Sequence, residues 1–483
     1  MLTDGGLSRA TFLLGALGAG AAALVGSGLT LSGNAAAQPP LAGVDWEPLR
    51  RQLRGRVLLP WESEYLSAKL LPNTRFDSAL PAAVIQVASV EDVQAAVTFA
   101  REHRLRVTAR NGGHSYVGAS AADGIVVLDL RQLNDVRYDS GQAKIGAGAL
   151  TSTVYETLAR SDQSLPAALC PGVGLTGLTL GGGIGVESRA YGLTCDRIVS
   201  AQVVLADGSV VETSATDRPE LFWALRGGGA RVGIVTSLTM STIPAVTKDI
   251  VRMTFPGESA ARVLAGWAQW LRTADRDTWG RVELNTDGGA LTCRTWLVGA
   301  DGAGKSAAAA LVRSFGVEPL TSSNRRVGLL DRVIDLAGEG GMTPGRTAFA
   351  AGSDILEEIS AEVADAIVGA IVERSRSGRP GNLHVSPLDG AVQDVSSDAT
   401  AFPWRRHTAV VQWAEYKLTD YVSARNWIDR AHERVAGHSA GAYFNYAEPS
   451  GTGQRYFAGN LNRLREIRMS VDPDNRIYSV PDI

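Results

Sequence analysis

The chain has few of the residues that build disulfide frameworks and metal sites. Its 483 residues include three cysteines and six histidines. Three thiols are too few for a disulfide framework, and their odd number leaves at least one thiol outside any internal bridge, whether or not Cys195 and Cys293 pair. The histidines are scattered, without the short Cys/His spacings of a zinc site. We therefore expect no metal site.

The chain also lacks an excess of positive charge and long apolar stretches beyond its N-terminus. Its formal net charge is −3, and arginine pairs such as Arg325-Arg326 stand isolated, so nucleic acid is not an expected partner. The later apolar runs are short, so no membrane contact is expected once the N-terminal segment is removed. Hydrophobic residues at 45% and charged residues at 20% are typical of a globular protein.

Residues 1–37 have the features of an export signal. Arg9 precedes an apolar run at 12–31, and Ala35-Ala36-Ala37 supplies the small residues that a signal peptidase requires. We expect cleavage after Ala37 and a secreted, extracytoplasmic protein. An uncleaved membrane anchor is the alternative, although its glycines make the run a weak span. The segment is similar to a twin-arginine signal, but Ala10 occupies the place of the second arginine, which leaves the export route open.

The hydrophobic periodicity predicts two sheets that follow one another in the chain. Before Pro244 we expect strands at 83–87, 106–110, 124–129, 143–146, 199–205, 210–212 and 233–241, with helices at 90–103, 150–160 and 220–225. Ser89 is placed to cap the first helix, and Asp207-Gly208 to turn a hairpin. Strand, helix and strand at 83–110 predict a right-handed βαβ unit. After Pro244 we expect strands at 251–254, 281–285, 291–298 and 409–416, with helices at 259–272, 304–315, 355–373 and 422–436.

The most distinctive stretch is Cys170–Gly185, which reads C-P-G-V-G-L-T-G-L-T-L-G-G-G-I-G. Each interior glycine costs a helix about 1 kcal/mol relative to alanine, so an ordinary helix is not expected, and glycine also packs poorly in a strand. Bare backbone N–H groups suit an anion such as a phosphate. A tight crossing of chain segments in the core is the alternative.

A second glycine-bearing stretch, Arg110–Tyr116, reads R-N-G-G-H-S-Y and directly follows an expected strand. Paired glycines at a strand end suit a pyrophosphate, because backbone N–H groups can surround it. The spacing is not G-x-G-x-x-G and no helix is expected to follow, so a nicotinamide-dinucleotide fold is a poor match. His114 alone has a second interpretation, as an ordinary core or surface histidine.

Together the two stretches resemble the berberine-bridge-enzyme-like FAD-linked oxidases, a branch of the vanillyl-alcohol-oxidase superfamily. Further blocks agree with that family at 188–196, 204–208, 220–229, 443–449, 459–464 and 472–475. The sequence departs from the family pattern at Ala230-Arg231-Val232 and at Trp404, where the family has histidine. The resemblance implies an α+β fold: a two-part FAD-binding domain with two α/β subdomains at 38–243, an antiparallel-sheet substrate domain with helices on one face at 244–440, and a C-terminal segment, 441–483, that returns to the FAD domain.

The resemblance also implies covalent FAD, with His114 bonded to the flavin 8α-methyl and Cys170 to C6. It places the pyrophosphate beside Asn111, Gly112, Gly113 and Ser115. It places the flavin and ribityl chain beside Val173, Gly174, Gly177, Gly182 and Gly185. It assigns positions near the cofactor to Ile234, Tyr456 and Asn460. Packing alone is the alternative role for Gly182 and Gly185, and a core position is the alternative for Ile234.

The same resemblance implies that Tyr446 is the catalytic base and Tyr443 its companion, with Glu448 in the place of the family's aspartate. A tyrosine has an ordinary pKa near 10, so neighbours must tune it for this role. Glu448 is placed to tune it or to act through water. A buried, hydrogen-bonded core tyrosine and an exposed salt-bridging glutamate are the alternatives.

The implied activity is that of a secreted FAD-dependent oxidase. Hydride is transferred from an alcohol carbon to flavin N5. Molecular oxygen then accepts the electrons from the flavin and becomes hydrogen peroxide. The expected substrate is a sugar or oligosaccharide, or a hydroxyl of a secondary metabolite. Oxidation of a C–N bond and formation of a C–C bond are less favoured reactions. A dehydrogenase that uses another acceptor, and a flavin-fold protein that binds its ligand without turnover, are the alternative functions.

Overall fold

The structure is a computed structural model that describes residues 43–168, 170–337 and 345–483. The expected export signal, residues 1–37, lies outside the described residues. Within the described ranges, no helix combines the length and the apolar character needed to cross a membrane. Cys170, Cys195 and Cys293 are free thiols, so the pairing of Cys195 with Cys293 that the sequence leaves open does not occur.

The first sheet has four strands in the order β1-β2-β4-β3. Its elements are β1 (Arg56–Leu58), β2 (Ala83–Gln86), β3 (Val107–Arg110), β4 (Val126–Asp129) and the helices α1 (Glu47–Gln52), α2 (Tyr65–Ala68) and α3 (Val90–Glu102). Because β4 lies between β2 and β3 and is parallel to both, the expected βαβ unit contains an inserted strand. The Ser89 cap is confirmed: its Oγ accepts the Asp92 N–H at 3.2 Å.

The second sheet is antiparallel and has five strands in the order β5-β6-β10-β8-β9. Its elements are β5 (Val136–Asp139), β6 (Gln142–Gly146), β8 (Ile198–Val204), β9 (Val210–Ser214), β10 (Ile234–Ser241) and the helices α4 (Thr151–Ala159) and α7 (Pro219–Leu225). The short strands β7 (Gln163–Ser164) and β11 (Ile243–Pro244) pair beside it. The expected hairpin is confirmed, and Gly208 turns it with a φ of +90°.

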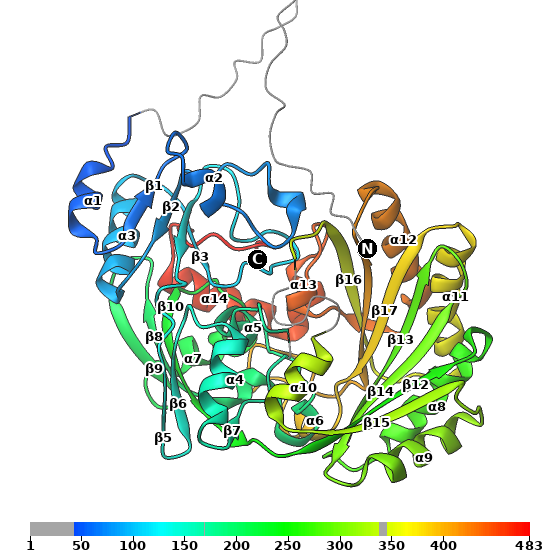
Figure 1. Ribbon diagram of the computed structural model, residues 1–483. Coiled ribbons are helices and arrows are strands. Elements are labelled where there is room, and N and C mark those ends of the chain that lie inside the picture. Colours follow the sequence, from blue (N-terminus) through cyan, green and yellow to red (C-terminus); the bar gives the residue numbers. More distant parts are fainter. Residues whose placement is uncertain (1–42, 169, 338–344) are drawn as a thin grey trace, which may run out of the picture. The chain divides into compact units, whose positions relative to one another are not determined.

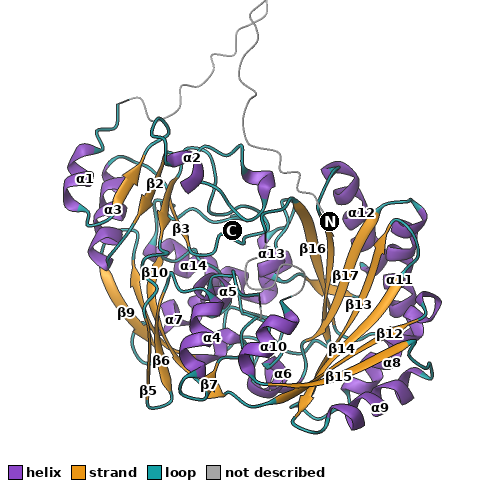
Figure 2. Cartoon of the chain, viewed as in Figure 1, coloured by secondary structure: helices purple, strands orange, loops and turns teal. Residues whose placement is uncertain are grey.

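The third sheet has eight strands in the order β15-β12-β14-β13-β17-β18-β16-β19. These are β12 (Lys248–Phe255), β13 (Trp279–Asp287), β14 (Thr292–Ala300), β15 (Thr321–Val327), β16 (Phe349–Leu356), β17 (Pro380–Pro387), β18 (Ala409–Tyr416) and β19 (Ser439–Gly441). The helices α8 (Ala260–Leu271), α9 (Gly304–Phe315), α11 (Ala361–Arg376) and α12 (Tyr421–Val435) cover one face of it (Figure 1, Figure 2). The expected antiparallel sheet with helices on one face is therefore confirmed.

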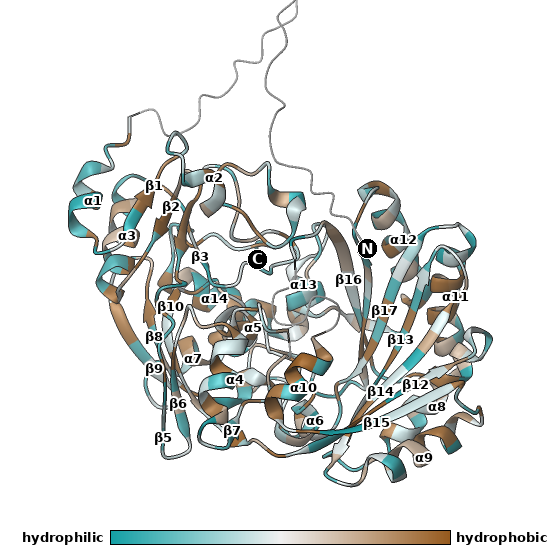
Figure 3. Cartoon of the chain, in the orientation of Figure 1, coloured by the Kyte–Doolittle hydropathy of each residue, from teal (hydrophilic) through white to brown (hydrophobic). Residues whose placement is uncertain are grey.

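Alternation along the strands determines which face of this sheet is covered. In β13, Val282 and Leu284 belong to the hydrophobic core beneath the helices, whereas Arg281 and Glu283 point to the opposite face. The face without helices, which we call the uncovered face, therefore carries charged side chains at this strand. The edge strand β15 was not expected from the sequence. Its first six residues are polar and exposed and only Val327 is buried, so apolar and polar residues do not alternate along it (Figure 3).

The glycine run contains a helix that the sequence argument excluded. Helix α5 (Leu175–Leu180) begins after Gly174 and ends before Gly181, so Gly177 is its only interior glycine. The expected penalty therefore applies once rather than at every glycine. The prediction was wrong because it treated the run as one conformational unit.

The helix expected at 355–373 begins six residues later. Residues 349–356 form β16, which is buried along its whole length, and α11 starts after Ser360, whose side chain accepts the Val363 N–H. A fully buried strand shows no period-two alternation, so the sequence could not separate it from the helix that follows.

The remaining elements connect the sheets. They are α6 (Ser188–Tyr191), α10 (Leu329–Leu336), α13 (Gly453–Phe457), α14 (Leu461–Val471) and the 3-10 helices η1 (Thr74–Phe76), η2 (Thr194–Arg197), η3 (Gly257–Ser259), η4 (Gly390–Asp394), η5 (Phe444–Tyr446) and η6 (Ala458–Asn460). After α14 the chain returns to β3, where Val107 donates its N–H to Arg476 O at 2.8 Å and its carbonyl accepts the Tyr478 N–H at 2.7 Å.

Candidate active site

The two glycine-bearing stretches, 110–116 and 170–185, lie against each other and form what we call the two-loop site. A Cβ added to Gly112 would lie 2.5 Å from Gly174 N, and one added to Gly174 would lie 2.3 Å from Cγ of Asn111. Asn111 in turn donates from Nδ2 to Ala147 O at 2.6 Å and to Ala149 O at 3.0 Å. Glycine is needed at both positions because backbone touches backbone.

Cys170 begins the second stretch of this site. Its carbonyl accepts the Thr151 hydroxyl at 2.5 Å, which ties the loop to the start of α4. Its side chain remains exposed, yet enough protein surrounds the thiol to raise its pKa, against the opposing charge of Arg281. The thiol is therefore protonated at neutral pH.

His114 approaches the same loop from the first stretch. Burial lowers its pKa, while a hydrogen bond to the Gly172 backbone opposes that shift. The imidazole is therefore neutral at neutral pH. Its partner Gly172 lies in a turn that begins at Cys170, where the Val173 N–H donates to the Cys170 carbonyl. The structure thus places His114 against the loop that Cys170 begins, which joins the two stretches that the sequence singled out for covalent attachment.

Three tyrosine rings lie at one side of the two-loop site. Tyr446 stacks on Tyr116 with ring centroids 5.3 Å apart and an interplanar angle of 15°, and Tyr443 meets its edge at 5.0 Å. Among the described residues, no hydrogen bond joins the Tyr446 hydroxyl to another group. Burial raises its pKa well above the ordinary value, Tyr443 adds to that shift, and Arg281 opposes it.

Tyr443 has a different environment. Its buried hydroxyl accepts the N–H groups of Gly183 at 3.0 Å and Ile184 at 3.2 Å, together with Nδ2 of Asn445 at 2.7 Å. Burial raises its pKa to about 12. Tyr443 therefore joins the C-terminal segment to the glycine run, and its oxygen has little capacity left for a substrate.

Glu448 is buried and ion-paired, not exposed. Its carboxylate contacts Arg425 at 2.9 Å and His432 at 2.9 Å, and accepts the Ser353 N–H at 3.3 Å. Within the residues that the structure describes, no hydrogen bond connects it to Tyr446. Direct tuning of Tyr446 by Glu448 therefore has no contact to support it.

The other expected cofactor residues divide into two groups. The first lies along the two-loop site; Gly113 and Gly182 there have φ of +70° and +116°. The other members of the first group are Ser115, Val173, Gly177 and Gly185. The second group has protein partners elsewhere: Ile234 is buried in β10, and Tyr456 accepts the Glu448 N–H at 2.8 Å.

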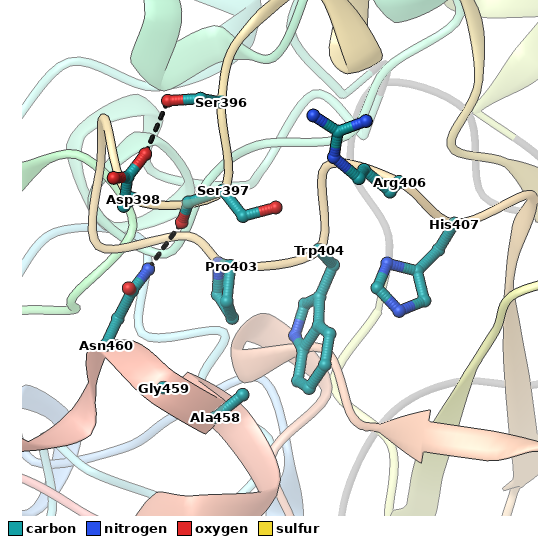
Figure 4. A pocket seen from close by; sticks show the side chains of 10 residues that line it. All are labelled: Ser396, Ser397, Asp398, Pro403, Trp404, Arg406, His407, Ala458, Gly459 and Asn460. Atoms are coloured by element: carbon teal, nitrogen blue, oxygen red, sulfur yellow. Dashed lines mark hydrogen bonds between the residues drawn. The ribbon is translucent and has the colours of Figure 1, made fainter.

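Asn460 belongs to the second group as well. It donates to Ser397 O at 2.7 Å and to Thr400 O at 3.0 Å, and so fastens the loop before β18. It lines a pocket of about 400 Å³ together with Trp404, Arg406 and His407 (Figure 4). Its visible role is to hold that loop.

The sequence argument missed a polar row on the uncovered face of the large sheet. Gln412 donates from Nε2 to the Tyr116 hydroxyl at 2.7 Å, and Glu283 pairs with Arg281 and accepts Trp296 Nε1–H at 2.9 Å. The signal was available in β13, where polar residues alternate with apolar ones, but not in β18, whose sequence shows no such alternation. It carried no meaning until the pairing of the strands was known.

His384 continues the same row. Its Nε2 lies 3.9 Å from Oε1 of Glu283. Burial lowers its pKa to about 4, and the charge of Arg281 adds to that effect. A neutral imidazole thus faces the two-loop site from the sheet.

Comparison with known proteins decides the family. A family model described as "FAD binding domain" matches residues 81–214, and one described as "Berberine and berberine like" matches residues 442–477. The chain is a berberine-bridge-enzyme-like FAD-linked oxidoreductase. The expected family and enzyme class are confirmed, and the two matched regions contain both stretches of the two-loop site and the tyrosine segment.

Relatives of this FAD-linked oxidoreductase span most of its length. The uncharacterized FAD-linked oxidoreductase YgaK of Bacillus subtilis is 28% identical over 88% of this chain and 96% of its own. Glucooligosaccharide oxidase of Sarocladium strictum is 28% identical over 83% of this chain and 87% of its own. The structure of BBE-like 1 from Physcomitrella patens superposes with a TM-score of 0.82 at 23% identity, covering 91% of this chain and 98% of that one.

The residues of the two-loop site fit FAD. Asn111 Oδ1 and Thr176 Oγ1 are buried and have no hydrogen-bond partner in the part of the chain that the structure describes, so each is available to hydrogen-bond a polar cofactor. A Cβ added to Gly177 would meet nothing within 4 Å, which leaves open space beside α5. Backbone at 111–115 would hold the pyrophosphate, and backbone at 173–185 would lie along the flavin.

Proposed function

We propose that this FAD-linked oxidoreductase oxidises a hydroxyl-bearing carbon of a sugar or oligosaccharide, with Tyr446 as the base. The observation that carries the proposal is Tyr446: its hydroxyl has no hydrogen-bond partner among the described residues, and its ring stacks on Tyr116, two residues after His114. Relatives named glucooligosaccharide, xylooligosaccharide and carbohydrate oxidase support the substrate class. A hydroxyl of a secondary metabolite is the alternative substrate.

The reaction removes a hydride from carbon and a proton from oxygen, and so converts the alcohol to a carbonyl compound. When bound, FAD supplies the acceptor for the hydride. Tyr446 takes the hydroxyl proton once its own proton has left. Because burial raises its pKa, the rate should rise with pH as the phenolate fraction grows. Molecular oxygen is the proposed final acceptor and is reduced to hydrogen peroxide.

Covalent attachment of FAD through His114 and Cys170 is the second part of the proposal. Each bond would join a protein atom to a flavin carbon. For each bond, one hydrogen leaves the His114 nitrogen or the Cys170 sulfur and one leaves the flavin carbon. The two electrons and two protons released in this way would reduce molecular oxygen to hydrogen peroxide. The neutral imidazole of His114 has a free lone pair, and the Cys170 side chain is exposed. Both properties support the assignment.

Acid precipitation tests the attachment. The unchanged protein should give a yellow pellet whose mass exceeds that of the chain by one FAD, and the double variant His114→Ala, Cys170→Ala should give a colourless one. Cys293→Ala is the matched control, because that thiol is buried in the substrate domain. A colourless pellet from the unchanged protein would refute covalent attachment.

The role of Tyr446 is tested with Tyr446→Phe, which removes only the hydroxyl. Loss of a general base lowers turnover by roughly 10²- to 10⁴-fold, whereas flavin content should stay the same. Tyr191→Phe, on α6, is the control. Turnover that survives in Tyr446→Phe would place the base elsewhere.

The substrate and the acceptor are tested together. Peroxide release should be measured with glucose, cellobiose, xylobiose and chitobiose, and with a set of polyketide alcohols. Release on the saccharides supports the proposal. Reduction of a dye without peroxide would instead identify a dehydrogenase, and flavin that no compound reduces would indicate a ligand-binding protein.

Export is proposed with the activity. The apolar run at 12–31 and the small residues before Gln38 support it. Protein recovered outside the cytoplasm should begin at Gln38, and N-terminal sequencing measures this. Full-length protein retained in the cytoplasm would contradict it.

A further inference from the structure

The segment that carries Tyr446 crosses the edge of the eight-stranded sheet. Strand β19 pairs with β16 as the edge strand, and just beyond it Tyr443 donates its N–H to Ser353 Oγ at 3.0 Å. Tyr446 then lies on the uncovered face, since its stacking partner Tyr116 contacts Phe349 of β16 at 5.0 Å. The chain turns around the edge immediately afterwards.

Glu448, two residues later, lies on the opposite, helix-covered face. Asp354 is five positions after Phe349 in β16 and so points to that other face, toward α12. His432 of α12 bridges the two carboxylates: Nδ1 lies 2.6 Å from Asp354 Oδ2, and Nε2 lies 2.9 Å from Glu448 Oε2. We call Asp354, His432 and Glu448 the His432 cluster.

The two carboxylates of the cluster are buried and hydrogen-bonded, and the His432 side chain between them is 17% exposed. The Asp354 side chain is 0% exposed and that of Glu448 is 3% exposed. Asp354 also accepts hydrogen bonds from Trp413 Nε1 at 2.8 Å and Ser439 Oγ at 2.7 Å. With a carboxylate on each side of the imidazole, both ring nitrogens must donate, so the arrangement requires the protonated ring.

The charges around His432 are nearly balanced. Arg455 donates to Asp354 at 3.0 Å and lies 3.2 Å from His432 Nδ1, and Arg425 donates to Glu448 at 2.9 Å. Asp429, on the next turn of α12, pairs with Arg425. Burial opposes protonation of His432, but its hydrogen bonds to the two carboxylates outweigh it and raise the pKa to about 9.

The strand itself is shaped to receive Glu448. A Cβ added to Gly352 would lie 2.5 Å from Glu448 Cδ, so the carboxylate rests directly on the backbone of β16. The Ser353 N–H then donates to it at 3.3 Å. Any side chain at 352 would displace the carboxylate.

We propose that the protonated His432 cluster positions Tyr446. The cluster holds Glu448 on the helix-covered face of the sheet, and the short turn between Tyr446 and Glu448 then keeps the Tyr446 ring stacked on Tyr116 on the uncovered face. This rests on the proposed role of Tyr446 as base. None of the three residues touches the two-loop site. They are therefore positioning residues. Loss of the proton should weaken one of the contacts that hold Glu448, beside those from Arg425 and the Ser353 N–H, without releasing the flavin.

The test combines rate, flavin content and backbone mobility in the holoenzyme. His432→Gln should lower the rate of anaerobic flavin reduction by cellobiose about 10- to 100-fold, the scale for a small misplacement of a reacting group. Flavin content should not change, and hydrogen exchange should rise at residues 443–448. His438→Gln, at an exposed histidine just after α12, is the matched control.

The pH profile supplies a readout that a purely structural role would not give. In the unchanged enzyme, the logarithm of the reduction rate should bend downward near pH 9, where His432 loses its proton. The bend should be absent in His432→Gln. Gly352→Ala, which displaces Glu448 without changing any charge, should reproduce the rate loss and the raised exchange.

A double-mutant cycle separates this proposal from the proposed function. In the Tyr446→Phe background, His432→Gln should cause no further loss of rate. An equal loss in both backgrounds would overturn the positioning role, as would unchanged hydrogen exchange at 443–448 in His432→Gln. Full activity of Tyr446→Phe alone would instead overturn Tyr446 as the base.

Discussion

The free energy of unfolding should fall as pH rises through the pKa of His432. In the folded protein that pKa is raised from 6.5 to about 9, although burial opposes the charged form, because Asp354 and Glu448 both accept hydrogen bonds from the ring. Between those two pH values the folded state keeps a proton that the unfolded state has lost, so stability decreases with pH. A shift of about 2.5 units corresponds to about 3 kcal/mol. This contribution is complete below the unfolded pKa and is lost above the folded one.

Urea unfolding of the unchanged protein and of His432→Gln measures the effect. Tryptophan fluorescence reports the transition, and both proteins should be compared from about pH 6 to about pH 9.5, a range in which most carboxylates stay ionised. The difference in unfolding free energy between the two proteins should shrink by about 3 kcal/mol across this range. A difference that does not vary with pH would show that His432 is neutral in the folded protein, and the charge argument would then be wrong.

Two further predictions concern the glycine contact and the buried ion pairs. Gly174→Ala should reduce FAD content sharply, because the new Cβ would lie 2.3 Å from Cγ of Asn111. Gly437→Ala, where a Cβ meets nothing within 4 Å, should leave FAD content unchanged. The ratio of flavin absorbance to protein measures both. Arg405→Met should lower the unfolding free energy by about 3–5 kcal/mol, because it leaves the carboxylate of Asp196 without its cationic partner in a buried pair. Arg463→Met, at an exposed pair, should cost at most about 1 kcal/mol in the same urea titration.

Local patterns in the sequence predicted most of the regular elements. The Ser89 cap, the Asp207-Gly208 hairpin and the strands β12, β13, β14 and β18 of the large sheet were found where they were expected. Two of the failures share one cause, which is that a wholly buried or wholly polar strand shows no periodicity in its sequence. Strand β16 is buried throughout, and β15 is exposed except for its last residue, so neither shows alternation.

The two glycine-bearing stretches could be singled out from the sequence, but the polar side chains that the sheet places opposite them could not. His114, Cys170 and the glycines between them lie within two short stretches whose composition already indicates a backbone cradle. Gln412, Glu283 and their neighbours come from different strands and meet only because β13, β17 and β18 pair in register. One sequence carries no information on that pairing, so these side chains could not be placed together in advance.

The C-terminal motif Y-F-N-Y-A-E illustrates how one short stretch performs three separate tasks. Tyr443 fixes the stretch to the glycine run through two backbone N–H groups, and Tyr446 keeps its hydroxyl free beside Tyr116. Glu448 lies on the opposite face of the sheet, because the chain turns around the sheet edge before it, and there His432 hydrogen-bonds its carboxylate. Tyr446 thus lies between two fixed points, each within three residues. A side chain held in this way pays little conformational entropy on binding a substrate, which is why we expect changes at Glu448 to affect the rate more than the flavin content.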